Sequence, residues 1–179
     1  MTTIHNTRLV ALSILCVIAF ATNSAAVDVC YVDGVVRAAV IQSNDPMDGL
    51  SSGACGHSIY GTNCRLDFTQ DQVAAVGPNT TCLALGRGVT VDMGNYSLIC
   101  PGPTGCGVGV TIGSSTGTGK TTITNGTFSG PFLEGVRSTL STSEVNNMRM
   151  EGGVTALSGL PVSDRVSIEN YYIGALLLG

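Results

Sequence analysis

The sequence predicts an all-β protein, a disulfide-bonded parallel β-helix (a solenoid) with about 22 residues in each coil. Glycine, threonine, serine and asparagine separate short segments rich in valine and isoleucine, and apolar positions recur at a nearly fixed step. Charged residues make up 11% of the chain, whereas ordinary domains carry about 25%. Many short strands between tight turns are typical of all-β folds.

The first 26 residues are typical of a secretory signal peptide. Arg8 precedes an apolar run over residues 9–21, and the small residues Ser24 to Ala26 form the expected cleavage site. The run is shorter than the roughly 20 apolar residues that span a bilayer; a signal anchor or a buried helix is the alternative. We expect cleavage after Ala26 and a secreted, extracellular protein with no transmembrane segment.

Cysteine usage also indicates an oxidising compartment. One cysteine, Cys16, lies in the predicted signal peptide, and six remain. An even number in a secreted chain indicates disulfide bonds, and the paired spacings of a zinc site are missing. The short spacing from Cys100 to Cys106 favours a disulfide that closes a turn-rich loop. The disulfide candidates are Cys30, Cys55, Cys64, Cys82, Cys100 and Cys106.

The predicted mature chain has the size of one domain. It is mildly acidic, and Lys120 is its only lysine, which argues against nucleic acid as a partner because that requires a basic surface. We expect residues 27–53 to form an N-terminal segment and residues 54–179 to form the β-helix. Within the first of these, residues 35–43 are expected to cap the solenoid as a short strand or helix.

The repeat is clearest in three segments that share the order aliphatic, x, Asn, x, x, apolar. Their asparagines, Asn125, Asn147 and Asn170, recur at steps of 22 and 23 residues, and the flanking apolar positions keep the same steps. We expect these asparagines to point inward and to bond to one another along the stack, because a buried amide needs partners. Ordinary turn chemistry is the alternative explanation.

A second motif, glycine followed by a strand-like run, alternates with the first. The loops between the two motifs vary in length while the strands stay in phase, as expected of a solenoid. A leucine-rich repeat would need leucines at fixed offsets, and helical repeats would need amphipathic helices. The second motif begins at Gly109, Gly135, Gly153 and Gly174.

Several segments resemble the right-handed parallel β-helix proteins of the pectin-lyase-like superfamily, over about residues 54–179. They are VTVDMGNYSLICPG, GVGVTIG, TTITNGTFSGPFLEGVRS, SEVNNMRMEGGVTAL and DRVSIENYYIGALLLG. The lead-in, a Cys-Gly pair with a later cysteine, is similar to that of secreted members, and this resemblance implies a disulfide between Cys55 and Cys82. The resemblance implies a fold and no single activity, since that fold hosts lyases, hydrolases, epimerases, adhesins and proteins without known chemistry.

Residues 113–122, GSSTGTGKTT, end like a phosphate-binding loop. The loop pattern requires glycine at position 114, which is Ser114 here. A phosphate-binding loop also leads into a helix, whereas the β-branched residues after Lys120 favour a strand. We therefore expect a polar loop between two strands and no bound nucleotide.

The catalytic signatures of the resembled superfamily are not intact in this chain. His57 is the only histidine of the mature chain, and its sequence neighbours are not acidic. The close acid pairs, Asp45 with Asp48 and Asp67 with Asp71, are too few for a calcium site. We assign no catalytic, metal-binding or cofactor-binding residues, and we expect no cofactor.

Two arginines are the candidate carbohydrate contacts. Arg137 and Arg149 fall in neighbouring predicted coils, and arginine pairs well with the carboxylates of acidic sugars; surface charge beside nearby glutamates is the alternative. Glycosylation sequons occur at Asn79, Asn95 and Asn125. Asn79 and Asn95 are the glycosylation candidates, because an inward Asn125 could not carry a glycan.

Two functions remain open. The first is a secreted protein that binds a polysaccharide, a polyuronate or another cell-wall glycan, and that derives from a carbohydrate-active family. If such a chain were an enzyme, it would be a polysaccharide lyase, hydrolase or epimerase, but the scattered carboxylates lean against catalysis. The alternative is a structural or adhesive protein of a cell surface or matrix. The chain stops inside a repeat at Gly179, so we expect a truncated C-terminus.

Overall fold

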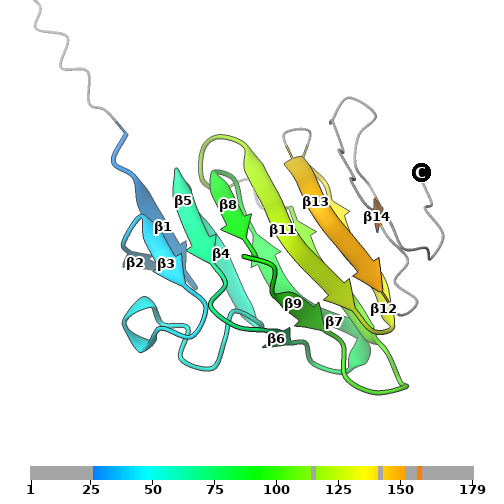
Figure 1. Cartoon of the computed structure of the whole chain (residues 1–179). Helices are drawn as coiled ribbons and strands as arrows, with labels where there is room; N and C mark the ends of the chain where they lie inside the picture. Colours follow the sequence, from blue (N-terminus) through cyan, green and yellow to red (C-terminus); the bar gives the residue numbers. More distant parts are fainter. Residues whose placement is uncertain (1–25, 114–115, 141–142, 152–156, 159–179) are drawn as a thin grey trace, which may run out of the picture.

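The computed structural model describes residues 26–113, 116–140, 143–151 and 157–158. Within these ranges, short strands follow one another along the chain, and the one helical segment is a 3-10 turn, η1 (Pro46–Asp48). The strands form two sheets, each built from segments that lie far apart in the sequence (Figure 1). None of the described helices is long and apolar enough to cross a membrane.

The first sheet has the strand order β14-β12-β10-β7-β4-β1-β2. From β4 to β14 every neighbouring pair is parallel, whereas β1 is antiparallel to both β4 and β2. Its strands are β1 (Val29–Val32), β2 (Val35–Arg37), β4 (His57–Thr62), β7 (Gly77–Leu85), β10 (Cys106–Ile112), β12 (Phe132–Ser138) and β14 (Leu157–Ser158).

The second sheet is parallel throughout the described residues. The long strand β11 pairs with β8 along its first part and with β9 along its second part, and β13 lies on its other side. The strands are β3 (Val40–Gln42), β5 (Cys64–Asp67), β6 (Gln72–Val73), β8 (Val89–Asp92), β9 (Ser97–Ile99), β11 (Thr121–Ser129) and β13 (Ser143–Glu151).

The chain passes from one sheet to the other and back, so each coil adds a strand to both. The result is a parallel β-solenoid of about four turns, which confirms the predicted fold class. The step of 22 residues holds between β11 and β13, where Ile123 pairs with Val145. Earlier coils are longer: Ile59 pairs with Leu85, 26 positions later, because their loops contain more residues.

The core lies between the two sheets and consists of the inward residues of each strand. Ile59, Leu85 and Ile112 stack in register on the first sheet, and all three are buried. The phenyl ring of Phe128 leaves no room for a side chain at Gly109, where a Cβ would lie 2.6 Å from the ring. Glycine at this position therefore lets the two sheets approach each other.

Three disulfides join the six cysteines of the described residues in pairs. The bonds Cys55–Cys82 and Cys100–Cys106 confirm the two predicted pairs, and the third bond is Cys30–Cys64. The first joins the beginning of one coil to the next, the second closes the turn between β9 and β10, and the third ties β1 to β5.

Residues 35–43 form two short strands at the N-terminal end of the solenoid. β2 extends the first sheet through an antiparallel hairpin with β1, and β3 is the outermost strand of the second sheet. The expected signal peptide, the segment around Asn170 and the glycine motifs at Gly153 and Gly174 lie outside the described residues, apart from Ala26.

Candidate functional site

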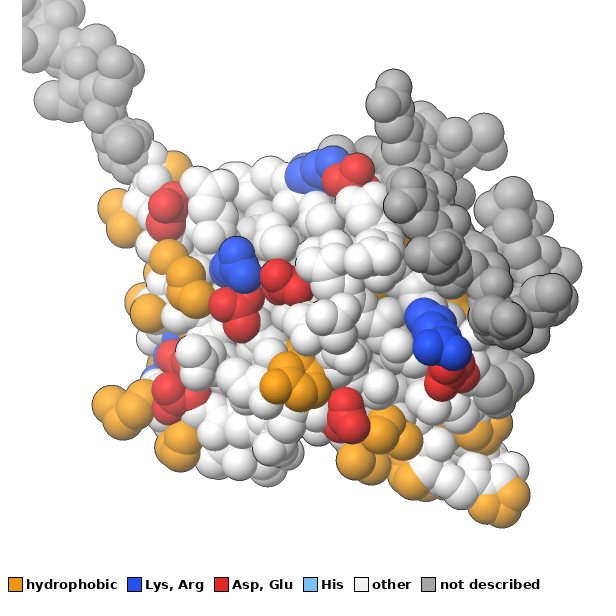
Figure 2. Space-filling model, in the orientation of Figure 1, with side chains coloured by type: hydrophobic (Ala, Val, Ile, Leu, Met, Phe, Trp, Pro, Cys, Tyr) orange, Lys and Arg blue, Asp and Glu red, His pale blue; other side chains and the backbone are white. Residues whose placement is uncertain are grey.

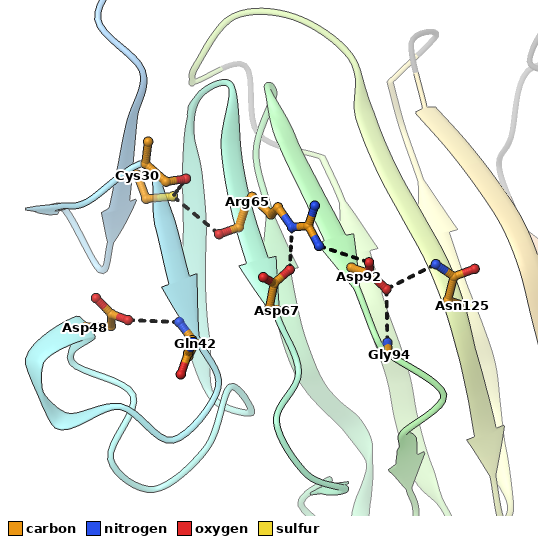
Figure 3. A network of polar contacts seen from close by, with 9 residues as sticks. Cys30, Gln42, Asp48, Arg65, Asp67, Asp92, Gly94 and Asn125 are labelled. Carbon is orange, nitrogen blue, oxygen red and sulfur yellow. Dashed lines mark hydrogen bonds and ion pairs between the residues drawn. The ribbon is translucent and has the colours of Figure 1, made fainter.

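A network of polar side chains covers part of the outer face of the second sheet (Figure 3). It begins at Arg65 on β5, which alternates with the buried Leu66 and therefore points outward. The Arg65 Nε lies 2.5 Å from Oδ1 of Asp67, and its Nη2 lies 3.1 Å from Oδ2 of Asp92 on β8. One guanidinium thus holds carboxylates from two successive coils.

The network continues from Asp92 toward the C-terminal coils. Oδ1 of Asp92 accepts hydrogen bonds from the backbone N–H of Gly94, at 3.0 Å, and from Nδ2 of Asn125, at 3.1 Å. Asn125 in turn accepts a bond of 2.8 Å from Nδ2 of Asn147. Hydrogen bonds and ion pairs therefore link side chains on β5, β8, β11 and β13 along the solenoid axis.

The prediction that the repeated asparagines point inward is wrong. Asn125 is half-buried and Asn147 is exposed, and both have left-handed backbones, with φ of 60° and 49°. Ile123 and Phe128 are both buried although five positions separate them, an odd number that would place them on opposite faces of a regular strand. The left-handed residue shifts the alternation of inward and outward side chains by one position, so its own side chain points outward. Asn170 lies outside the described residues.

The charges within the network reinforce one another. The hydrogen bond and the charge of Asp67 raise the pKa of Arg65 above its ordinary value; burial works against this, and the charge of Asp92 adds a smaller increase. Arg65 therefore stays protonated, and the group of three side chains carries one net negative charge. This arrangement orients the two carboxylates but leaves no excess positive charge for an anionic ligand.

The structure does not bring the two candidate arginines together. Arg137 lies on β12 of the first sheet and Arg149 on β13 of the second, and both are exposed. The two arginines lie close together in the sequence, but the chain crosses from the first sheet to the second after β12. They therefore lie on different sheets. Arg137 forms two hydrogen bonds with Glu134, of 2.6 and 2.8 Å, and the pKa of Arg137 is raised by this bonding. Arg149 forms an ion pair of 2.7 Å with Glu151.

The described part of the Gly-Lys-Thr segment has the contacts of a polar loop. Lys120 forms an ion pair with Glu144 on β13, and Thr118 bridges to Thr62 of an earlier coil. The next residue, Thr121, begins β11. The chain therefore enters a strand where a phosphate-binding loop would enter a helix.

The two acid pairs noted in the sequence do not form carboxylate clusters. Asp45 accepts a hydrogen bond from the backbone amide of Met47 in η1, and Asp48 accepts one from the amide of Gln42 at the end of β3. Asp71 accepts a bond from the amide of Ser97, whereas Asp67 belongs to the network described above. Within the described ranges no three His, Cys, Asp or Glu side chains are grouped to hold a metal ion.

A second group of side chains was missed by the sequence analysis. Nδ1 of His57 lies 2.6 Å from Oδ2 of Asp33, which belongs to the turn between β1 and β2. Burial works to raise the pKa of Asp33, but the amide of Ser58 and then the hydrogen bond and charge of His57 together lower it. Beside this pair, the rings of Tyr31 and Tyr60 stack at 4.9 Å. An Asp-Gly turn between two apolar segments was the available signal, since it predicts a hairpin.

The two glycosylation candidates are accessible. Asn79 lies in β7 and Asn95 in the turn before β9, and both are exposed. Asn95 has a left-handed backbone with φ of 71°.

The fold and its polar faces define a disulfide-bonded parallel β-solenoid. Comparison of the chain with protein-family models, with curated proteins and with solved structures found no match.

Proposed function

We propose that this protein is a secreted, non-catalytic polysaccharide-binding protein related to the β-helix proteins of the pectin-lyase-like superfamily. The observation that carries the proposal is the polar network on the outer face of the second sheet, from Arg65 to Asn147. Donors and acceptors repeat along this face with the spacing between strands, about 4.8 Å. An extended glycan presents hydroxyl groups along its whole length and can contact successive coils. The three disulfides support secretion.

Rows of small polar side chains accompany the network. Thr90 pairs with Thr122, and Thr124 pairs with Asn146, all on strands whose alternate residues are buried. These side chains are short and β-branched or amidic, so they make a flat surface with hydroxyl and amide groups. Such a surface suits the flat side of a polysaccharide chain better than a deep active-site cleft does.

We further propose that the glycan is neutral. Figure 2 shows that the blue groups on this face adjoin red groups, that further red groups stand apart, and that most of the surface is uncharged. The cations Arg65, Lys120 and Arg149 each form an ion pair with an acid of the same face. A polyuronate would have to displace these acids, and its carboxylates would be repelled by them. A neutral glycan needs only hydrogen bonds.

Binding to insoluble and soluble polysaccharides tests the proposal. The mature chain is incubated with cellulose, xyloglucan, mixed-linkage β-glucan and polygalacturonate, and retention is measured by co-sedimentation or affinity electrophoresis. We expect retention on at least one neutral glycan, little change up to about 1 M NaCl because the ligand is uncharged, and no release of sugars. Retention on polygalacturonate alone with strong salt sensitivity would contradict the neutral-glycan proposal.

Two substitutions locate the binding face. Thr90→Val and Thr122→Val remove hydroxyls and keep the β-branched shape, so each should weaken binding about three- to tenfold. Thr111→Val, on the outer face of the first sheet in β10, is the matched control and should leave binding unchanged. No retention on any glycan, or equal losses in all three variants, would overturn the proposal in favour of a structural role.

A further inference from the structure

A second array of side chains occupies the outer face of the first sheet near its N-terminal edge. Tyr31 on β1 is paired in register with Tyr60 on β4, and the next pair along the same strands, Val32 and Ile59, is buried. The backbone amide of Asp33 donates a hydrogen bond to the carbonyl of Ser58, so Asp33 and Ser58 form the following pair along the two strands. Two tyrosines, an aspartate and a serine thus form a two-by-two array on the outer face.

The apolar side of this array consists of aromatic rings that solvent still reaches. The rings lie 4.9 Å apart and only 8° from parallel, and both tyrosines are half-buried. Ile59 pairs with Leu85, the last residue of β7, so Gly86, which directly follows the strand, lies level with Tyr60. Since Gly86 has no side chain, the position level with Tyr60 offers no side chain to cover its ring.

The polar side is held in place by the pair Asp33 and His57. The Asp33 carboxylate receives the amide of Ser58 at 2.8 Å and Nδ1 of His57 at 2.6 Å, while half of its side chain remains exposed. Burial works to raise the pKa of Asp33, but these contacts together lower it, so the carboxylate is ionised and accepts hydrogen bonds near neutral pH. Within the described residues, Nε2 of His57 and the two phenol hydroxyls have no hydrogen-bond partner and can meet a ligand.

We propose that this array is a binding site for a single hexopyranose residue, separate from the glycan-binding face of the second sheet. Adjacent positions on the array are about 5 Å apart across the strands and about 7 Å apart along them, which is the size of a pyranose ring. The apolar C–H face of the sugar packs on Tyr60. Two neighbouring hydroxyls donate to Asp33, and Nε2 of His57 or a phenol completes the contacts.

NMR titration with the methyl glycosides of glucose, galactose and mannose tests this site. We expect the ring signals of Tyr31, Tyr60 and His57 to shift with at least one of them, and saturation applied to the aromatic protons to transfer to the C–H protons of that sugar. Both measurements use the unmodified mature chain. An absence of shifts and of transfer for all three glycosides would overturn the proposal.

Substitutions distinguish this site from other surfaces. Tyr60→Ala should raise the dissociation constant about tenfold because the stacking surface is lost, and Tyr60→Phe should change it less than about threefold. Asp33→Asn should weaken binding without disturbing the tyrosine stack. Tyr96→Ala removes an exposed tyrosine outside this array and should have no effect. Shifts that persist in Tyr60→Ala would place the sugar elsewhere and contradict the proposal.

The outcome is separable from that of the proposed function. Thr90→Val and Thr122→Val lie on the other sheet and should leave the monosaccharide shifts intact. Conversely, Tyr60→Ala should leave polysaccharide retention by the second sheet intact. Loss of both activities in Tyr60→Ala, with an unchanged amide spectrum, would show that the two surfaces are one site and would overturn the claim of a separate one.

Discussion

At the scale of single residues, the repeated asparagines act through their backbones as well as their side chains. A left-handed backbone at Asn125 and Asn147 lets two outward residues follow each other, so that the apolar residues on both sides face the core. Asparagine tolerates this conformation better than most residues. The sequence reveals the repeat of asparagine, but the face that it occupies depends on this dihedral angle, which spacing alone does not show.

Two substitutions at Asn125 separate the backbone effect from the hydrogen bonds. Asn125→Gly keeps the left-handed backbone but removes the bonds to Asp92 and Asn147, which should cost about 1–2 kcal/mol of the free energy of unfolding. Asn125→Ala loses the same bonds, and it should lower the free energy of unfolding by about 1 kcal/mol more because alanine is strained in the left-handed conformation. Urea unfolding measures both. The neighbouring Asn146→Ala is the control and should cost less than about 0.5 kcal/mol. Equal stability of the Gly and Ala variants would contradict the backbone argument.

At the scale of strands and turns, the disulfides cross-link elements that hydrogen bonds also join or hold close together. Cys30–Cys64 closes a separation of 34 residues between the N-terminal hairpin and β5, whereas Cys100–Cys106 closes only 6. A cross-link that closes a longer loop removes more entropy from the unfolded chain. The two bonds should therefore differ in what they contribute to stability, although both are buried.

Paired serine substitutions test this difference. Replacing Cys30 and Cys64 should lower the free energy of unfolding by about 4 kcal/mol, and replacing Cys100 and Cys106 by about 2 kcal/mol. Chemical unfolding of the two variants gives the comparison directly, with the other two disulfides verified by mass spectrometry. A larger loss from the short-loop pair would show that local packing at the turn, rather than chain entropy, dominates.

Loop lengths and strand pairing also explain which site residues could be predicted from the sequence. The spacing of six residues was enough to predict Cys100–Cys106, because a short loop brings its ends together. His57 and Asp33 are 24 positions apart, and they meet only because β1 runs antiparallel to β4. Likewise Asp67 and Asp92 become neighbours through the register of β5 and β8. Pairings between strands set these contacts, and the local sequence does not encode the register.

At the scale of the whole molecule, the fold was predictable because a solenoid repeats the same arrangement of strands and turns in each coil. Each coil contacts mainly its neighbours, so apolar residues in phase were sufficient to indicate stacked strands. The N-terminal end departs from this pattern. Its outer strands β2 and β3 each have a second edge that pairs with no other strand among the described residues, and Figure 2 shows hydrophobic side chains gathered at this end, at the left of the view. Three valines of β2 and β3 are exposed: Val35, Val36 and Val40.

This one-dimensional organisation predicts a gradient of local stability along the solenoid axis. Two backbone amides with similar hydrogen bonds report it: Ser43 donates to Asp67 at the N-terminal end, at 3.0 Å, and Met93 donates to Thr124 in the middle, at 2.9 Å. Opening β3 exposes one strand, whereas opening β8 breaks contacts on both sides, so Ser43 should exchange with solvent at least about a hundredfold faster than Met93. Hydrogen exchange followed by NMR measures both rates. Equal protection at the two amides would mean that the coils unfold as one unit, which contradicts the nearest-neighbour description.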